Sequence, residues 1–107
     1  MQRITDKDLD QLATYLNQIT DSPIEYRNKE TGKSNSGHYT ISHAYGGVCL
    51  HRISNASGGC STPLVHGHIP KRELFEKMHA FIKGIEFAKW ENELKAQKER
   101  VAAWEHL

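Results

Sequence analysis

Apolar residues near the start of the chain recur three or four positions apart. The repeat runs from Leu9 to Ile19 and would form one apolar stripe on a helix. Thr5 can cap this helix, and Asp8 stands three positions later, as in a capping box. Asp21-Ser22-Pro23 ends the repeat, because the residue before a proline disfavours helical geometry. We therefore predict a helix over residues 5–20 that covers a sheet.

The middle of the chain alternates between apolar and polar residues, which is typical of a half-buried strand. The alternation begins at Ile24, is interrupted by a polar loop over residues 31–37, and then resumes. Gly46-Gly47 is expected to supply the positive φ angles of a tight hairpin, with residues 48–53 as the returning strand. We predict that residues 24–54 form a small antiparallel sheet with a Gly-Gly hairpin.

Residues 55–69 contain several glycines and few strong helix or strand formers, so we predict a long loop there. Pro70 suits the first turn of a helix with a further apolar stripe. Gly84 would either end that helix or weaken it. Two C-terminal helical segments are therefore predicted, over residues 70–84 and 85–106.

The last segment has a second apolar repeat, with the spacing of a coiled coil. Its members at heptad a and d positions are Phe87, Trp90, Leu94, Val101 and Trp104, with Gln97 as the polar interruption. The repeat is shorter than the three or four heptads that indicate a coiled coil by themselves. Two interpretations stay open: a tail helix that packs on its own domain, or a helix that joins subunits.

Length and composition predict a single α+β domain over residues 1–107. Hydrophobic residues make up 37% of the chain, so one copy would bury a modest core, and we expect a homo-oligomer, either a dimer or a hexamer. Lys+Arg and Asp+Glu number 14 and 13 and nearly cancel. A duplex nucleic-acid partner is not expected, because it usually requires a broad positive field.

The cellular location of the protein and the redox state of its cysteines can be predicted from the sequence. Residues 1–19 contain three aspartates where a signal peptide needs an apolar segment, and no apolar run has the length of a membrane helix. We expect a cytoplasmic protein, without a membrane partner, that keeps Cys49 and Cys60 as free thiols.

Seven histidines and two cysteines raise the question of a metal site or a catalytic thiol. Cys60, His66 and His68 share one loop, and Cys49 and His51 share one strand face, but there is no C-x-x-C pair and no H-x-x-x-H helix motif. The local signature of a thiol or serine hydrolase is also missing. We predict no metal, no cofactor, no catalytic residue and no enzymatic activity.

Glycine-rich turns before a basic helix start indicate an anion site. Lys71 and Arg72 would oppose the helix dipole at a cost of about 0.3–1 kcal/mol, which a bound anion would reverse. A tyrosine at the turn could stack on a base, and nearby polar residues could bond its edge or ribose. The predicted ligand-binding residues are Tyr45, Gly46, Gly47, Arg52, Asn55, Gly58, Gly59, His66, His68, Lys71 and Arg72. The alternative is ordinary hairpin chemistry and a solvated first helical turn, since a GxxxxGK[ST] loop is absent.

The segment from Gly37 to Gly84, about half of the chain, resembles small phage proteins. The residues that carry the resemblance are Ala44-Tyr45-Gly46-Gly47, Leu50, Asn55, Gly58-Gly59, Lys71-Arg72-Glu73-Leu74 and Ala80-Phe81-Ile82. Among those proteins, the segment is similar to the first-described Thoeris anti-defence family, phage sponges that sequester cyclic ADP-ribose signals and in some members also cyclic oligonucleotides.

This resemblance implies a homo-oligomer that binds its ligand without cleaving it. In that family an aromatic residue, an asparagine and helix arginines surround the ligand, and Tyr45, Asn55 and Arg72 are the matching residues here. Glu76 stands where a second arginine would follow one turn later, which leaves the identity of the ligand open.

The function expected from the sequence is sequestration of a phosphorylated signalling nucleotide, in the host cytoplasm during infection, to counter host defence. The alternative function is a protein–protein inhibitor that uses the Phe87–Trp104 helix to bind a host enzyme or a transcription component. The two differ in the part of the chain that meets the partner.

Overall fold

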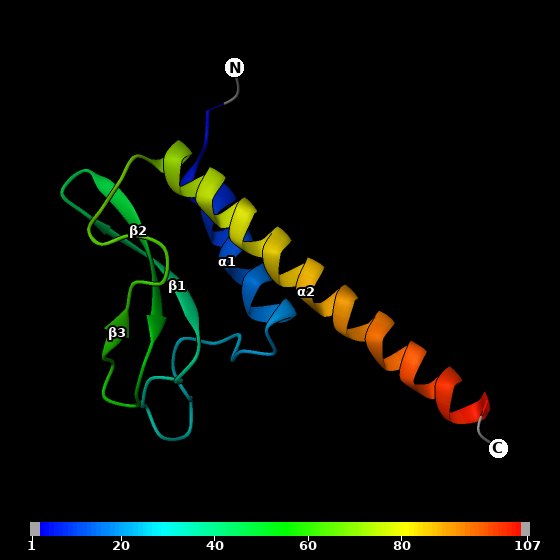
Figure 1. The fold of residues 1–107 in the computed structure, drawn as a ribbon. Helices are drawn as coiled ribbons and strands as arrows, with labels where there is room; N and C mark the ends of the chain where they lie inside the picture. Colours follow the sequence, from blue (N-terminus) through cyan, green and yellow to red (C-terminus); the bar gives the residue numbers. More distant parts are fainter. Residues whose placement is uncertain (1–2, 106–107) are drawn as a thin grey trace.

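A computed structural model describes residues 3–105, with side chains up to residue 102. In chain order the elements are α1 (Asp6–Ile19), β1 (Tyr39–Ala44), β2 (Gly47–Ile53), β3 (Cys60–Ser61) and α2 (Lys71–Glu105). The strands form one antiparallel sheet in the order β1-β2-β3, and the short α1 and the long α2 lie side by side next to it (Figure 1). The α+β fold expected from the sequence is therefore confirmed.

Helix α1 begins as its sequence predicts. The side chain of Thr5 accepts a hydrogen bond from the Asp8 backbone N–H at 3.2 Å, and the Asp8 carboxylate accepts one from the Thr5 N–H at 2.9 Å. This reciprocal pair satisfies two of the N–H groups that a helix start leaves without partners. The helix ends at Ile19, one residue before the predicted boundary.

The sheet is smaller than its polar–apolar alternation predicted. It begins at Tyr39, whereas the sequence had placed its start at residue 24. Ile24 and Tyr26 are exposed, and the isolated bridge between Arg27 and Ser34 does not extend into a strand. Alternation alone does not make a strand, because the backbone also needs a neighbouring strand with which to bond.

The β1–β2 hairpin is confirmed, but its turn lies one residue earlier than predicted. Ala44 pairs with Gly47, so the turn residues are Tyr45 and Gly46, with φ angles of +53° and +73°. Gly47 has a different role. A Cβ atom at Gly47 would lie 2.9 Å from the Ile69 carbonyl oxygen, so glycine is needed there for the close approach of the segment that precedes α2.

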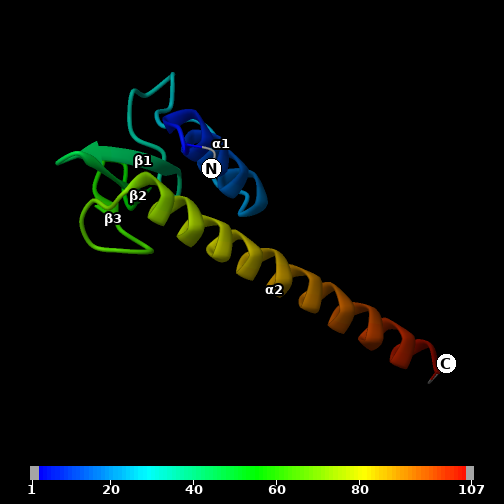
Figure 2. The same ribbon diagram turned by 90° about the horizontal axis from the view of Figure 1, so that it is seen from above.

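The core lies where α1, α2 and one face of the β1–β2 hairpin meet (Figure 2). Its fully buried side chains include Leu9, Leu16, Leu50, Leu74 and Met78. The two helices run in the same direction, because contacts join successive parts of each. Asp6 pairs with Lys71, the Tyr15 hydroxyl donates to Glu86, and Lys89 donates to the Ile19 carbonyl.

Helix α2 is one continuous element of 35 residues, whereas the sequence had predicted two segments divided at Gly84. A glycine inside a helix costs about 1 kcal/mol, and the flanking Ile82 and Ile85 pack on the core and offset that cost. At about 1.5 Å per residue α2 is roughly 52 Å long, against roughly 21 Å for the 14 residues of α1.

The C-terminal half of α2 consequently extends away from the rest of the molecule, as both views show (Figures 1 and 2). The radius of gyration is 17.6 Å, whereas a compact domain of this length has one of about 13 Å. Neither of the two helices in residues 3–105 is long and apolar enough to cross a lipid bilayer.

Asn17 connects α1 to the outer edge of β1. Its side chain is buried, its amide donates to the Tyr39 carbonyl at 3.1 Å, and its carbonyl accepts from the Tyr39 N–H at 2.8 Å. The same amide lies 3.3 Å from Nδ1 of His38, which is also buried. One side chain thus provides hydrogen-bond partners for the backbone N–H and C=O of Tyr39, a residue of the edge strand β1.

We expect Asn17→Ala to lower the free energy of unfolding by about 3 kcal/mol, because it leaves the buried N–H and C=O of Tyr39 without partners. Urea denaturation of the full chain measures this change. Gln18→Ala, at the exposed neighbouring position, is the control and should change the stability by less than about 0.5 kcal/mol. Equal effects of the two substitutions would contradict the assigned role of Asn17.

Candidate functional site

Strand β2 separates the predicted ligand-binding residues into two groups. Tyr45, Gly46 and Gly47 lie at the hairpin tip, close to the start of α2, because Val48 and Ile69 exchange backbone hydrogen bonds of 2.8 and 2.9 Å. Arg52 lies near the other end of β2, and Asn55, Gly58 and Gly59 follow that end. Seven residues of strand span roughly 23 Å, so within one chain the structure does not bring the two groups to one site.

The hairpin-tip group consists of Tyr45, Gly46, Gly47, His68, Lys71 and Arg72. Tyr45 is 98% exposed, and its ring centre lies 5.8 Å from that of His68. His68 is held in place by Ser42, whose Oγ lies 3.1 Å from its Nε2. A non-glycine residue with a positive φ is uncommon, so a fully exposed tyrosine in this conformation at a turn is a candidate contact residue.

A carboxylate of the chain itself already faces Lys71. The Asp6 carboxylate lies 2.9 Å from Lys71 Nζ and 3.8 Å from His43 Nδ1. The hydrogen bond from Lys71 lowers the pKa of Asp6, and the charges of Lys71 and His43 lower it further. Asp6 therefore gives Lys71 the negative partner that the sequence argument assigned to a ligand. Arg72 is exposed on the same first turn of α2.

The far-end group consists of Arg52, Asn55, Gly58 and Gly59. Asn55 shapes its own loop, because its carbonyl accepts from the N–H groups of Ser57 at 3.0 Å and Gly59 at 3.1 Å. A Cβ atom at Gly59 would lie 2.6 Å from the side-chain amide nitrogen of Asn55, so a larger residue there would displace the Asn55 side chain. The predicted ligand contact of Asn55 thus coincides with a structural role.

Arg52 lies beside a small polar depression of about 270 Å³. Its Nε donates to the Gly37 carbonyl at 3.4 Å, and its guanidinium carbon lies 5.1 Å from the centre of the Tyr39 ring. The other residues that line the depression are Ser36, Gly37, Ile53, Ser54 and Ser61. Tyr45 and Arg72 do not line it, so this depression is not the predicted pocket.

The cysteines and histidines that the structure describes do not form a metal-binding cluster. Cys49 is buried, with its Sγ 3.7 Å from the Val65 carbonyl, and burial raises the pKa of its thiol, which disfavours the nucleophilic thiolate. Cys60 is exposed. His66, the predicted ligand residue that we assign to neither group, is exposed, with its Nδ1 3.3 Å from Thr62 Oγ1. Within residues 3–105, no three histidine, cysteine or acidic side chains are placed to hold a metal ion.

The projecting half of α2 carries an exposed apolar stripe, which we define as Phe87, Trp90, Leu94 and Val101. Phe87, Trp90 and Val101 are 58%, 55% and 52% exposed. Phe87 follows the buried Met78 by nine positions, which is two and a half turns at about 100° per residue, so the two side chains lie on opposite sides of the helix. The stripe therefore lies on a face of α2 other than the one that packs on the core.

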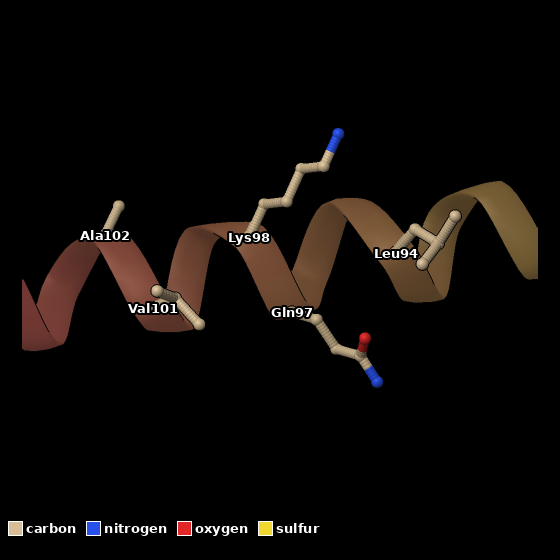
Figure 3. Close-up of a pocket in the computed structure, with 5 residues that line it drawn as sticks. All are labelled: Leu94, Gln97, Lys98, Val101 and Ala102. Atoms are coloured by element: carbon tan, nitrogen blue, oxygen red, sulfur yellow. The ribbon is translucent and has the colours of Figure 1, made fainter.

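Part of this stripe forms an open surface made by α2 alone. Figure 3 shows its five side chains, which come from successive turns of the helix: Leu94, Gln97, Lys98, Val101 and Ala102. Because one helix supplies every lining residue, a second wall would have to come from another chain. The heptad spacing of the sequence indicated this surface. It could not show that the body of the domain ends before it. The side chain of Trp104 lies outside the described residues.

His51 should make the stability depend on pH. Burial lowers its pKa, and the nearby His68 lowers it further. In the unfolded chain His51 has a pKa of about 6.5 and takes up a proton near that pH. In the folded state its lower pKa disfavours protonation at the same pH. The unfolded state thus binds more protons as pH falls below that value, and stability decreases from about pH 7.5 to about pH 5.

We expect His51→Gln to reduce this decrease, measured as the difference between urea midpoints at the two pH values. His79→Gln, at an exposed position of α2, is the control and should leave the decrease as it is in the unsubstituted chain. If His51→Gln leaves the pH dependence unchanged, His51 is not its source.

Comparison of the chain with protein-family models, curated proteins and solved structures found no match. The two surfaces described above, the hairpin tip and the exposed stripe of α2, are therefore the basis on which a function can be argued.

Proposed function

We propose that this protein is a non-catalytic binding protein that acts by packing the projecting half of α2 against another helix. The observation that carries the proposal is the exposed stripe, whose aromatic and aliphatic side chains are more than half exposed at Phe87, Trp90 and Val101. Complete burial of such a side chain contributes about 1.5–3 kcal/mol. A partner helix that covered this face would therefore stabilise the complex by a large part of that amount for each exposed side chain.

The shape of α2 supports a helical partner. Lys89 donates to the carbonyl of Ile19, at the end of α1, and Figure 1 shows that the following turns of α2 continue beyond α1. Isolated helices of about 12–15 residues are marginal in water, so a partner helix would also stabilise the segment that binds it. The a and d spacing of the stripe suits knobs-into-holes packing, and Gln97 would help to set its register.

The test compares two substitutions that introduce the same charge on opposite sides of α2. We expect Trp90→Glu to abolish capture of the helical partner, whether another polypeptide or an untagged copy of this chain, because it places a carboxylate within the stripe. Asn92→Glu, at an exposed position two residues later, should retain it. Affinity capture with the tagged full chain, followed by mass spectrometry, measures both.

The proposal is wrong if every captured polypeptide is bound equally by the two variants. Circular dichroism of both variants should show the same helix content, which separates a lost contact from a lost fold.

A second candidate function, the sequestration of a phosphorylated signalling nucleotide, is favoured by one observation at the hairpin tip. Tyr45 keeps a positive φ and an exposed ring beside His68 and the start of α2, where backbone N–H groups and Arg72 attract anions. We propose that a base would stack on Tyr45 while the phosphates approach this helix start. The ion pair between Asp6 and Lys71 is evidence against this proposal, because the Asp6 carboxylate already lies at the start of α2, where the phosphates would bind.

Tyr45→Asn separates the two effects of this tyrosine. Asn-Gly is a favoured pair for a two-residue turn with positive φ angles, so the variant should be more stable by about 0.5–1 kcal/mol. It should also bind cyclic ADP-ribose at least roughly tenfold more weakly, measured by titration calorimetry, because the stacking ring is lost. Lys77→Ala, on an exposed turn of α2, is the control for binding. Undiminished binding by Tyr45→Asn would reject this site.

A further inference from the structure

We infer that the exposed stripe binds the same stripe of a second copy of this chain, with the two α2 helices antiparallel. This inference rests on the proposed function and names its partner. The observation behind it is the distribution of charge along the two edges of the stripe. A partner helix must face these edges as well as the apolar residues themselves.

Charged residues flank the stripe in two blocks of opposite sign. Counting Phe87 and Leu94 as a positions and Trp90 as a d position, the acidic residues Glu91 and Glu93 occupy the e and g positions of the first half. Lys98 and Arg100 occupy the next e and g positions, and all four residues are exposed. Each edge of the stripe therefore changes from acidic to basic along the helix.

An antiparallel pair places each acidic block against a basic block. Glu91 then faces Lys98 of the second copy, and Glu93 faces Arg100 of the second copy. Two-fold symmetry repeats each contact, so each of these opposite charges has a partner. The dipoles of the two helices also attract each other in this antiparallel arrangement.

A parallel pair is less favourable. In a parallel coiled coil each g position faces the e position of the partner five residues later. Glu93 would again face a cation, Lys98 of the second copy, but Glu86 would face Glu91 of the second copy, and symmetry repeats this repulsion. Glu91 therefore discriminates between the two orientations, because it meets a cation in one and an anion in the other.

The residues at the a and d positions and the shape of the chain are compatible with the antiparallel arrangement. Trp90 faces Val101 of the second copy, and Leu94 faces Gln97 of the second copy. The stripe lies about half a turn from Met78, so the body of each chain does not cover it. The two bodies lie at opposite ends of the helix pair, because each α2 projects away from its own body (Figure 2).

The test is sedimentation velocity of the full chain over a range of concentrations. The unsubstituted chain, of 12.2 kDa, should reach the mass of a dimer. Glu91→Lys should weaken the dimer roughly tenfold, because it replaces two symmetric attractions with repulsions. Adding Lys98→Glu to that variant should restore the dimer, since the charges of the pair are then exchanged.

Glu99→Lys is the matched control. It changes the net charge by the same amount and, like Glu91→Lys, removes one charge pair with Lys95 within the helix, but it lies outside the a, d, e and g positions. It should leave the dimer constant within about twofold.

A tighter dimer for Glu91→Lys would indicate the parallel arrangement and overturn the inference. An unsubstituted chain that stays monomeric would also overturn the inference. A monomeric chain that still captures another polypeptide, and loses it with Trp90→Glu, would overturn this inference alone and leave the proposed function standing.

Discussion

The length of α2 is the constraint on which the rest of the structure depends. The body of the protein, made of α1 and a small sheet, covers the first half of α2, up to the contact of Lys89 with the carbonyl of Ile19 at the end of α1. Beyond that point the helix continues to Glu105, with apolar residues on one face. The two halves of α2 therefore differ: the first half closes the core through Leu74 and Met78, and the second half leaves Phe87, Trp90 and Val101 exposed.

The first half of α2 is anchored by interactions that lie far apart in sequence. Asp6 holds the first turn through Lys71, the bridge between Val48 and Ile69 attaches the preceding segment to β2, and a small Gly47 permits that bridge. Such an anchored first half fixes the direction in which the second half projects. A helix anchored at one end and free at the other is suited to carry a docking face away from the body.

The sequence predicted what depends on neighbouring residues. The capping box of Thr5 and Asp8 and the hairpin between β1 and β2 are local features, and both are present. The sequence analysis placed the turn one residue late. Gly47 is a glycine because it closely approaches the backbone of Ile69, and no local sequence pattern reveals that contact. The continuity of α2 through Gly84 has the same origin, since packing of the flanking residues outweighs a local propensity.

The candidate site shows the same division. Tyr45, His68 and Lys71 do lie at one end of the hairpin. Sequence could not show that β2 would hold Asn55 at the opposite end, nor that Asp6 would reach Lys71, because both depend on tertiary packing. The exposed stripe was visible as a heptad pattern with two open interpretations. The structure shows that most of the stripe is exposed, and its binding to another chain is our proposal.

Small-angle X-ray scattering of the unsubstituted chain tests the central claim most directly, because it gives mass and shape together. A helix-joined antiparallel pair predicts twice the mass of one chain and a radius of gyration clearly above the 17.6 Å of the single chain. The mass of one chain at every concentration, with a radius of gyration near that of the single chain, would contradict the claim that the projecting half of α2 is an association surface.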